Sequence, residues 1–149
     1  SLEDNILDVI VGSEAPDFTL RDSKGNSFNL SDFENEKVVV LEFMNMGCGS
    51  CHSFEKDVLK SYCNSTTMPE DVEVISLTQT EDVSQEDLEE RAEGKNWAYV
   101  FGSEEMTDAF GADRSPSIVI IDKDGIVTFS ESGPMTESEL KEKVDEALG

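Results

Sequence analysis

Short apolar runs separated by polar or amphipathic stretches occupy most of this chain of 149 residues. The most apolar run is VVVL at 38–41, a β-branched stretch typical of a central strand that is buried on both faces. A second run, VEVISL at 72–77, has a similar character. The two runs therefore predict parallel strands in the middle of a sheet.

Two helices are marked most clearly. The first follows the strand at 38–41 and is expected to extend to about Tyr62. The second begins at Thr136, which Glu139 follows at the spacing of a capping box, and ends at Leu148. The inner face of the first helix is expected to carry Phe54, Val58 and Leu59.

The remaining segments predict hairpins and shorter elements. Glycine-containing turns at 22–26 and 122–125 separate short runs, which is typical of β-hairpins. The expected elements are strands at 17–20, 27–30, 97–101, 117–121 and 126–129, and helices at 31–33, 86–93 and 104–110. Residues 1–11 are expected to form a short packed lead-in segment of ambiguous type. The order predicts an α/β fold in which helices cover both faces of a mixed sheet that carries an N-terminal β-hairpin extension.

Composition limits the classes of partner. Asp and Glu number 34 against 11 Lys and Arg, which gives a formal net charge of −23 and predicts an acidic surface. Such a field repels nucleic acid and anionic membranes, so neither is expected as a direct partner. The length suits a single domain over 1–149 without an internal linker. No apolar run approaches the roughly 18 residues of a membrane helix.

The cysteines carry the candidate chemistry. Three cysteines are too few for a disulfide scaffold. Cys48 and Cys51, however, are separated by two residues, at the point where a helix is expected to follow a buried strand. The unpaired N–H groups and partial positive charge of a helix N-terminus favour a thiolate. Cys48 is therefore expected to be the exposed nucleophile, and Cys51 the sulfur that resolves a mixed disulfide. Cys63 is expected to be a structural free thiol.

Several stretches resemble the extracytoplasmic thioredoxin-like family of the TlpA or ResA type, which borders the peroxiredoxin superfamily. They are GSEAPDFTL at 12–20 with LSDF at 30–33, KVVVLEF at 37–43, and FGADRSPSIVIIDKDG at 110–125. The resemblance extends from about residue 12 to the C-terminus. It implies a thioredoxin-like fold and a thiol–disulfide oxidoreductase whose partners are protein thiols or disulfides and an upstream dithiol donor or acceptor.

The resemblance also implies roles for single residues. Ser115 and Pro116 are expected to form a cis peptide that faces the disulfide and pairs with an extended substrate strand. Glu42 is expected to be a buried proton acceptor for Cys51, the alternative being a strand-edge carboxylate that points to water. The expected substrate-binding residues are Gly47, Gly49, Ser50, Ser115 and Pro116. Neither a cofactor nor a metal is expected, because the two sulfurs carry the electrons.

The family type implies an extracytoplasmic location, with a cytoplasmic one as the alternative. The chain begins at Ser1 rather than Met, which is compatible with removal of a signal or membrane tether. A monomer is expected.

Some positions depart from the family pattern. Met46 and Gly47 replace the usual Trp ahead of the first cysteine, so a less aromatic rim is expected. Lys56 replaces a helix proline, which removes that cause of a kink. The carboxylate that cytochrome-maturation members carry three residues after the second cysteine is Phe54 here. The adjacent Glu55 would lie about 100° around an α-helix from it.

Three other functions compete with disulfide exchange. The letters from Cys48 to His52 match a c-type haem attachment motif, although that motif is unusual directly after a buried strand. The two cysteines, with His52 or Met46, could instead bind copper or another soft metal as a chaperone. A peroxiredoxin-like peroxidase is disfavoured because Asn45 replaces the threonine that family has three residues before its reactive cysteine.

Overall fold

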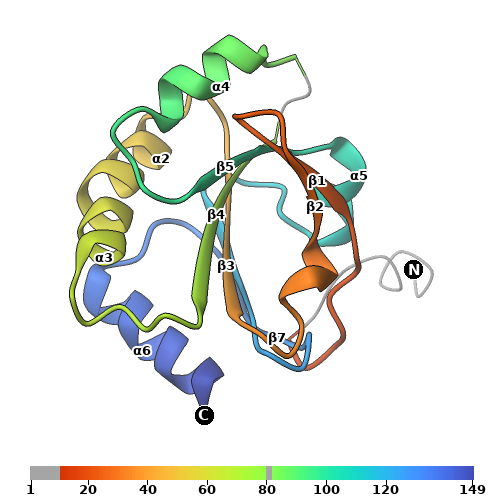
Figure 1. Cartoon of the computed structure of the whole chain (residues 1–149), viewed down its shortest axis with the longest axis vertical. Coiled ribbons are helices and arrows are strands. Elements are labelled where there is room, and N and C mark those ends of the chain that lie inside the picture. The colour runs from red at the N-terminus through yellow and green to blue at the C-terminus, as the bar shows by residue number, and fades with distance from the viewer. Residues whose placement is uncertain (1–10, 80–81) are drawn as a thin grey trace.

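The computed structural model describes residues 11–79 and 82–149, so residues 1–10 of the expected lead-in segment lie outside it (Figure 1). In the described residues one sheet of seven strands has the order β2-β1-β5-β4-β3-β6-β7. The strands are β1 (Thr19–Asp22), β2 (Ser27–Asn29), β3 (Val38–Met44), β4 (Val72–Thr78), β5 (Ala98–Phe101), β6 (Ser117–Ile121) and β7 (Val127–Ser132). The helices are η1 (Leu30–Phe33), α2 (Gly49–Phe54), η2 (Glu55–Leu59), α3 (Lys60–Asn64), α4 (Gln85–Ala92), α5 (Glu104–Ala109) and α6 (Glu137–Leu148).

The sheet is mixed, as predicted. β3 runs parallel to β4, and β4 runs parallel to β5, whereas the remaining pairs are antiparallel. The hairpin of β1 and β2 joins this core through the pairing of β1 with β5. The predicted α/β class and the N-terminal hairpin extension are therefore confirmed.

Alternation along β3 divides the core into two layers. Val38 and Val40 pack on one face of the sheet with apolar residues of α2, α4 and α6. Val39 and Leu41 pack on the other face with residues of η1 and α5. Figure 1 shows α2, α3, α4 and α6 on one side of the sheet and α5 on the other. Because both faces are covered, all four residues are buried and the run has no polar face.

Some boundaries differ from the prediction. β1 begins two residues later than expected, at Thr19, and β7 extends to Ser132. The extension follows from pairing, since Ser132 lies opposite Ser117 in the antiparallel ladder with β6. Backbone hydrogen bonds to a neighbouring strand thus maintain a strand through polar residues with no alternating pattern.

The helix after the two cysteines contains an unexpected π turn. Residues Glu55–Leu59 are π-helical, and the N–H of Lys60 donates to the carbonyl oxygen of Glu55. A π turn inserts extra backbone, so the side chains before and after it keep facing the core. As a result Phe54, Glu55 and Leu59 are all buried, while Val58 is half-buried. Phe54 and Glu55 follow Cys51 by three and four residues, which is the spacing that places all three side chains on one face of a helix.

No helix among the described residues combines the length and the apolar character needed to cross a membrane.

Candidate active site

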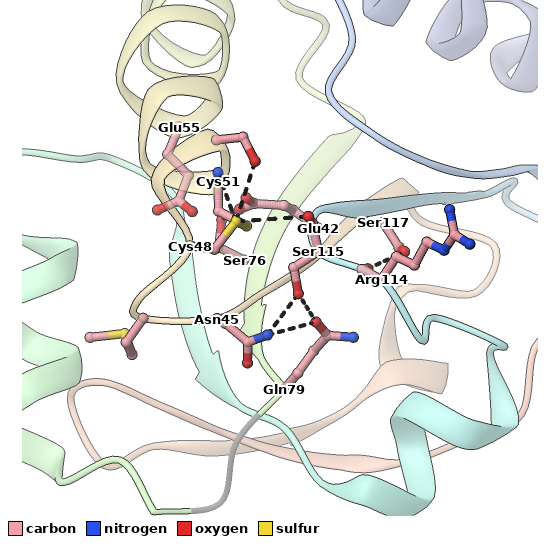
Figure 2. Close-up of a disulfide and its surroundings, with 12 residues drawn as sticks. Glu42, Asn45, Cys48, Cys51, Glu55, Ser76, Gln79, Arg114, Ser115 and Ser117 are labelled. Carbon is pink, nitrogen blue, oxygen red and sulfur yellow. Dashed lines mark hydrogen bonds between the residues drawn. A yellow bond between two sulfur atoms is a disulfide. The ribbon is translucent and has the colours of Figure 1, made fainter.

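Cys48 and Cys51 form a disulfide at the start of α2, with their Cα atoms 5.3 Å apart (Figure 2). Cys48 is the N-cap residue, and its Sγ accepts a hydrogen bond from the N–H of Cys51 at 3.1 Å. Cys51 is fully buried, whereas Cys48 is half-buried and its neighbours Gly47, Gly49 and Ser50 are exposed. A partner molecule can therefore reach Cys48 but not Cys51.

The loop before β6 lies against this disulfide. The Ser115-Pro116 peptide bond is cis, and the carbonyl oxygen of Ser115 lies 3.8 Å from the Sγ of Cys48. Ser115 is half-buried, while the ring of Pro116 is buried. The hydroxyl of Ser50 lies 3.4 Å from the same sulfur. The residues expected to bind substrate thus surround Cys48, although Pro116 can contribute little side-chain surface.

A polar network that we did not predict holds this loop. Figure 2 shows Asn45, Gln79 and Ser115 meeting below the disulfide. Asn45 Nδ2 donates to Ser115 Oγ at 2.8 Å, Ser115 Oγ donates to Gln79 Oε1, and Gln79 Nε2 donates to the carbonyl oxygen of Ala112. Asn45 and Gln79 directly follow β3 and β4, two parallel strands. Their position at the carboxyl ends of such strands is a signal that sequence reasoning could have used.

Glu42 is completely buried on β3, so the alternative of a carboxylate pointing to water is wrong. Its Oε1 accepts a hydrogen bond from Ser76 Oγ at 2.6 Å, and Trp97 Nε1 donates to the same hydroxyl at 2.9 Å. Its Oε2 has no hydrogen-bond partner. Burial raises the pKa of Glu42 well above its usual value, and the neighbouring Glu55 raises it further.

A second buried carboxyl group, that of Glu55, belongs to the same polar cluster. Arg91 of α4 donates from Nε to Glu55 Oε1 at 2.8 Å and from Nη2 to Oε2 at 3.0 Å. The hydroxyl of Tyr99 donates to Oε1 at 2.6 Å. Arg91 Nη1 also donates to the carbonyl oxygen of Met46, two residues before Cys48, at 3.2 Å. None of these contacts was predicted, because Arg91 and Tyr99 are distant from Glu55 in the sequence.

Two other candidates lie away from this cluster. The side chain of His52 is exposed on α2. Cys63 is a free thiol on α3, and burial together with the charge of Glu73 raises its pKa to about 12. Among the described residues, no three or more His, Cys, Asp and Glu side chains form a group that could hold a metal ion.

Comparison of sequences relates the chain to known proteins. The Redoxin family model matches residues 10–148. The thiol-disulfide oxidoreductase ResA of Geobacillus thermodenitrificans is 30% identical over 142 residues, which cover 92% of this chain and 78% of that protein. ResA of Bacillus subtilis is 27% identical over 128 residues, which cover 85% and 70%.

Solved structures support the same fold. A thiol:disulfide interchange protein DsbE of Chlorobium tepidum matches with a TM-score of 0.78 and 21% identity, over 95% of this chain and 99% of that one. The thioredoxin domain of a thiol-disulfide oxidoreductase of Bacteroides vulgatus matches with a TM-score of 0.74 and 24% identity, over 91% and 99%. At these identities the likeness establishes a thioredoxin-like fold.

Proposed function

The chain belongs to the Redoxin family and is a ResA-type thiol–disulfide oxidoreductase, and we propose that Cys48 is its attacking sulfur, Cys51 its resolving sulfur and Glu42 its proton relay. The observation that carries this assignment is the difference in exposure between the two sulfurs. Cys48 is accessible at a helix N-terminus, whereas Cys51 is buried and can attack only the Sγ of Cys48.

In the reducing direction the thiolate of Cys48 attacks a partner disulfide, and one partner sulfur leaves as a thiolate. Cys51 then transfers its proton to the Glu42 carboxylate, and the new thiolate attacks the Sγ of Cys48 and releases the second partner thiolate. Two electrons pass to the partner, and the protein ends with the Cys48–Cys51 disulfide. In the oxidising direction every step reverses, and Glu42 returns the proton to Cys51. No prosthetic group is needed, because the two sulfurs hold the electrons.

Partner proteins bind, in this proposal, as an extended segment beside the loop of Ser115 and Pro116. The proximity of the Ser115 carbonyl oxygen to the Cys48 sulfur supports this, because a segment paired with that backbone would present its own sulfur to Cys48. Gly47, Gly49 and Ser50 leave the other side of Cys48 open. Partners are therefore proteins with accessible thiols or disulfides, together with an upstream dithiol donor or acceptor.

The proposal also includes a tethered monomer that works outside the cytoplasm, as the resemblance to the TlpA and ResA type implies. Labelling of intact cells with a membrane-impermeant thiol reagent tests the location. Cys48 should be labelled before lysis, and protection until lysis would favour the cytoplasm. Sedimentation of the purified protein tests whether it is a monomer.

Trapping of mixed disulfides tests the roles of the two cysteines. Cys51→Ser should accumulate adducts with partner proteins from a cell extract, because the captured sulfur cannot be displaced. Cys48→Ser should accumulate none, and Cys63→Ser is the matched control that should behave like the wild type. Adducts on Cys48→Ser alone would reverse the assignment. A wild type that exchanges no disulfide but binds stoichiometric copper would favour metal carriage instead.

A further inference from the structure

Arg91 connects three parts of the molecule close to the segment that carries the disulfide. It lies on α4, pairs with both carboxylate oxygens of Glu55, and donates to the carbonyl oxygen of Met46 in the segment that leads to Cys48. The side chains of Arg91 and Glu55 are 8% and 0% exposed. A buried ion pair of this kind is costly to break from one side, because the remaining charge loses its compensation.

The cluster holds more potential negative charge than positive charge. Glu42 and Glu55 are both fully buried, and the guanidinium of Arg91 is the cation that pairs with Glu55. If both carboxyl groups were ionised, one buried negative charge would lack compensation. The pair is therefore expected to hold its last proton more tightly than an ordinary carboxyl group does.

The hydrogen bonds indicate which carboxyl group keeps that proton. Glu55 accepts two bonds from Arg91 and one from the Tyr99 hydroxyl, and each of these stabilises its ionised form. Glu42 accepts one bond from Ser76, and its Oε2 is left without a partner. The geometry thus favours Glu55 as the carboxylate and Glu42 as the carboxylic acid. Burial raises the pKa of Glu42, which agrees with this distribution.

We propose that Arg91 is a positioning residue for disulfide exchange: its ion pair keeps Glu55 ionised, so that Glu42 is the carboxyl group that exchanges a proton with Cys51, and it anchors the Met46 backbone ahead of Cys48. The inference rests on the proposed roles of Glu42 and Cys51 and extends them to a residue that touches neither sulfur. α4 is thereby part of the redox site, although it lies beside α2 at the rim of the fold (Figure 1).

The groups around Glu42 determine how the proposal can be tested. Glu55 of η2 raises the pKa of Glu42 through its charge, and Arg91 of α4 lowers it. Tyr99 of β5 and Ser76 of β4 contribute hydroxyl groups to the same cluster. Lys95 lies at the edge of the cluster: its ammonium group donates to the Arg91 carbonyl oxygen, lies 5.8 Å from the centre of the Tyr99 ring and interacts electrostatically with Glu55. Removal of the Arg91 charge and removal of the Glu55 charge should therefore move the pKa of Glu42 in opposite directions.

Stopped-flow reaction of the reduced protein with dithiobis(nitrobenzoate) separates the two sulfur steps. In a Cys63→Ser background, the first release of thionitrobenzoate reports attack by Cys48, and the second reports attack by Cys51 on the mixed disulfide. The rate of the second release should rise with pH as Glu42 loses its proton. Arg91→Met should move the midpoint of that rise upward by about one pH unit, because a charge at hydrogen-bond distance shifts a pKa by roughly one to three units. Glu55→Gln should move the midpoint downward.

Further variants distinguish charge from folding. Arg91→Lys keeps the positive charge, so its midpoint should lie close to that of the wild type. Arg21→Met is the matched control, since it removes a guanidinium group of β1 that lies over the Phe101 ring of β5. An unchanged midpoint in Arg91→Met, or shifts of the same sign in Arg91→Met and Glu55→Gln, would refute the role of Arg91. Absence of a second release from the wild type would instead refute the proposed function itself. Near-ultraviolet circular dichroism verifies the fold of each variant.

Discussion

The carbonyl oxygen of Ser115 lies 3.8 Å from the Sγ of Cys48, a residue 67 positions earlier in the chain. The register of the sheet produces this contact. β6 pairs with β3 in antiparallel fashion, with Ser117 opposite Phe43, and the continued register brings Ser115 opposite Asn45. The start of β6 is therefore held beside the turn that carries the cysteine. A partner segment that binds this loop is aligned with the accessible sulfur.

Asn45→Ala should weaken the use of protein substrates. The substitution removes the hydrogen bond from Asn45 Nδ2 to Ser115 Oγ, so the loop loses one of its anchors. One such bond contributes about 0.5–1.5 kcal/mol, which corresponds to up to about a tenfold increase in KM for a protein disulfide. Reaction with dithiobis(nitrobenzoate) should change little, because this small reagent needs no backbone pairing. Asn64→Ala, which removes a surface amide bonded to the Lys60 carbonyl oxygen, is the control. Equal losses with both substrates would contradict a docking role.

The central strands and the cysteine pair could be predicted because their signals are local. The run at 38–41 is apolar at every position, which is the pattern of a strand covered on both faces. In the structure, helices do pack on both faces of this strand. Cys48 and Cys51 are close in sequence, so their proximity needs no knowledge of the tertiary fold. Glu42 stands out locally as an ionisable residue that interrupts this apolar stretch, and the likeness to a known family then supplied its role and added the loop at Ser115.

The Glu55 cluster could not be predicted from the same signals. Glu55 follows the buried Cys51 by four residues, so helix periodicity permits an inward position but does not indicate what a charged residue would pair with there. The partners of Glu55 are distant in sequence: Arg91 is 36 positions away and Tyr99 is 44. The stabilisation of this buried carboxyl group thus depends on tertiary contacts that no local pattern indicates.

Glu42→Gln should slow the Cys51 step selectively. Glutamine preserves the size of the side chain and its bond from Ser76, but it cannot accept the proton of Cys51. Loss of a general base typically costs 10²–10⁴-fold, so a decrease on the order of 100-fold is expected in the second release of thionitrobenzoate at neutral pH. The first release, which reports Cys48, should stay within about twofold of the wild type. Equal slowing of both releases would indicate a disturbed helix start rather than a lost proton relay.

The same substitution should change how stability depends on pH. Because burial raises the pKa of Glu42 above the ordinary value of 4.5, the folded protein binds this proton more tightly than the unfolded chain does. The resulting stabilisation is complete below that value and is lost as pH rises toward the pKa in the folded state. Glu42→Gln cannot ionise, so its free energy of unfolding should gain on that of the wild type as pH rises above 4.5. Urea unfolding of the oxidised proteins over a pH series measures the difference. A constant difference between the two proteins across the series would contradict a raised pKa.

Alkylation should distinguish the site cysteine from Cys63. Burial, with a smaller contribution from Glu73, raises the pKa of the Cys63 thiol to about 12, so very little thiolate exists there at neutral pH. Cys48 sits at a helix N-terminus, where the N–H of Cys51 donates to its sulfur and favours a thiolate. Iodoacetamide at less than one equivalent should therefore modify Cys48 in the reduced protein and leave Cys63 free, as peptide mass spectrometry can measure. Labelling of Cys63 should rise as pH approaches 12. Preferential labelling of Cys63 at neutral pH would show that its thiol is not buried and that its pKa is not raised in solution.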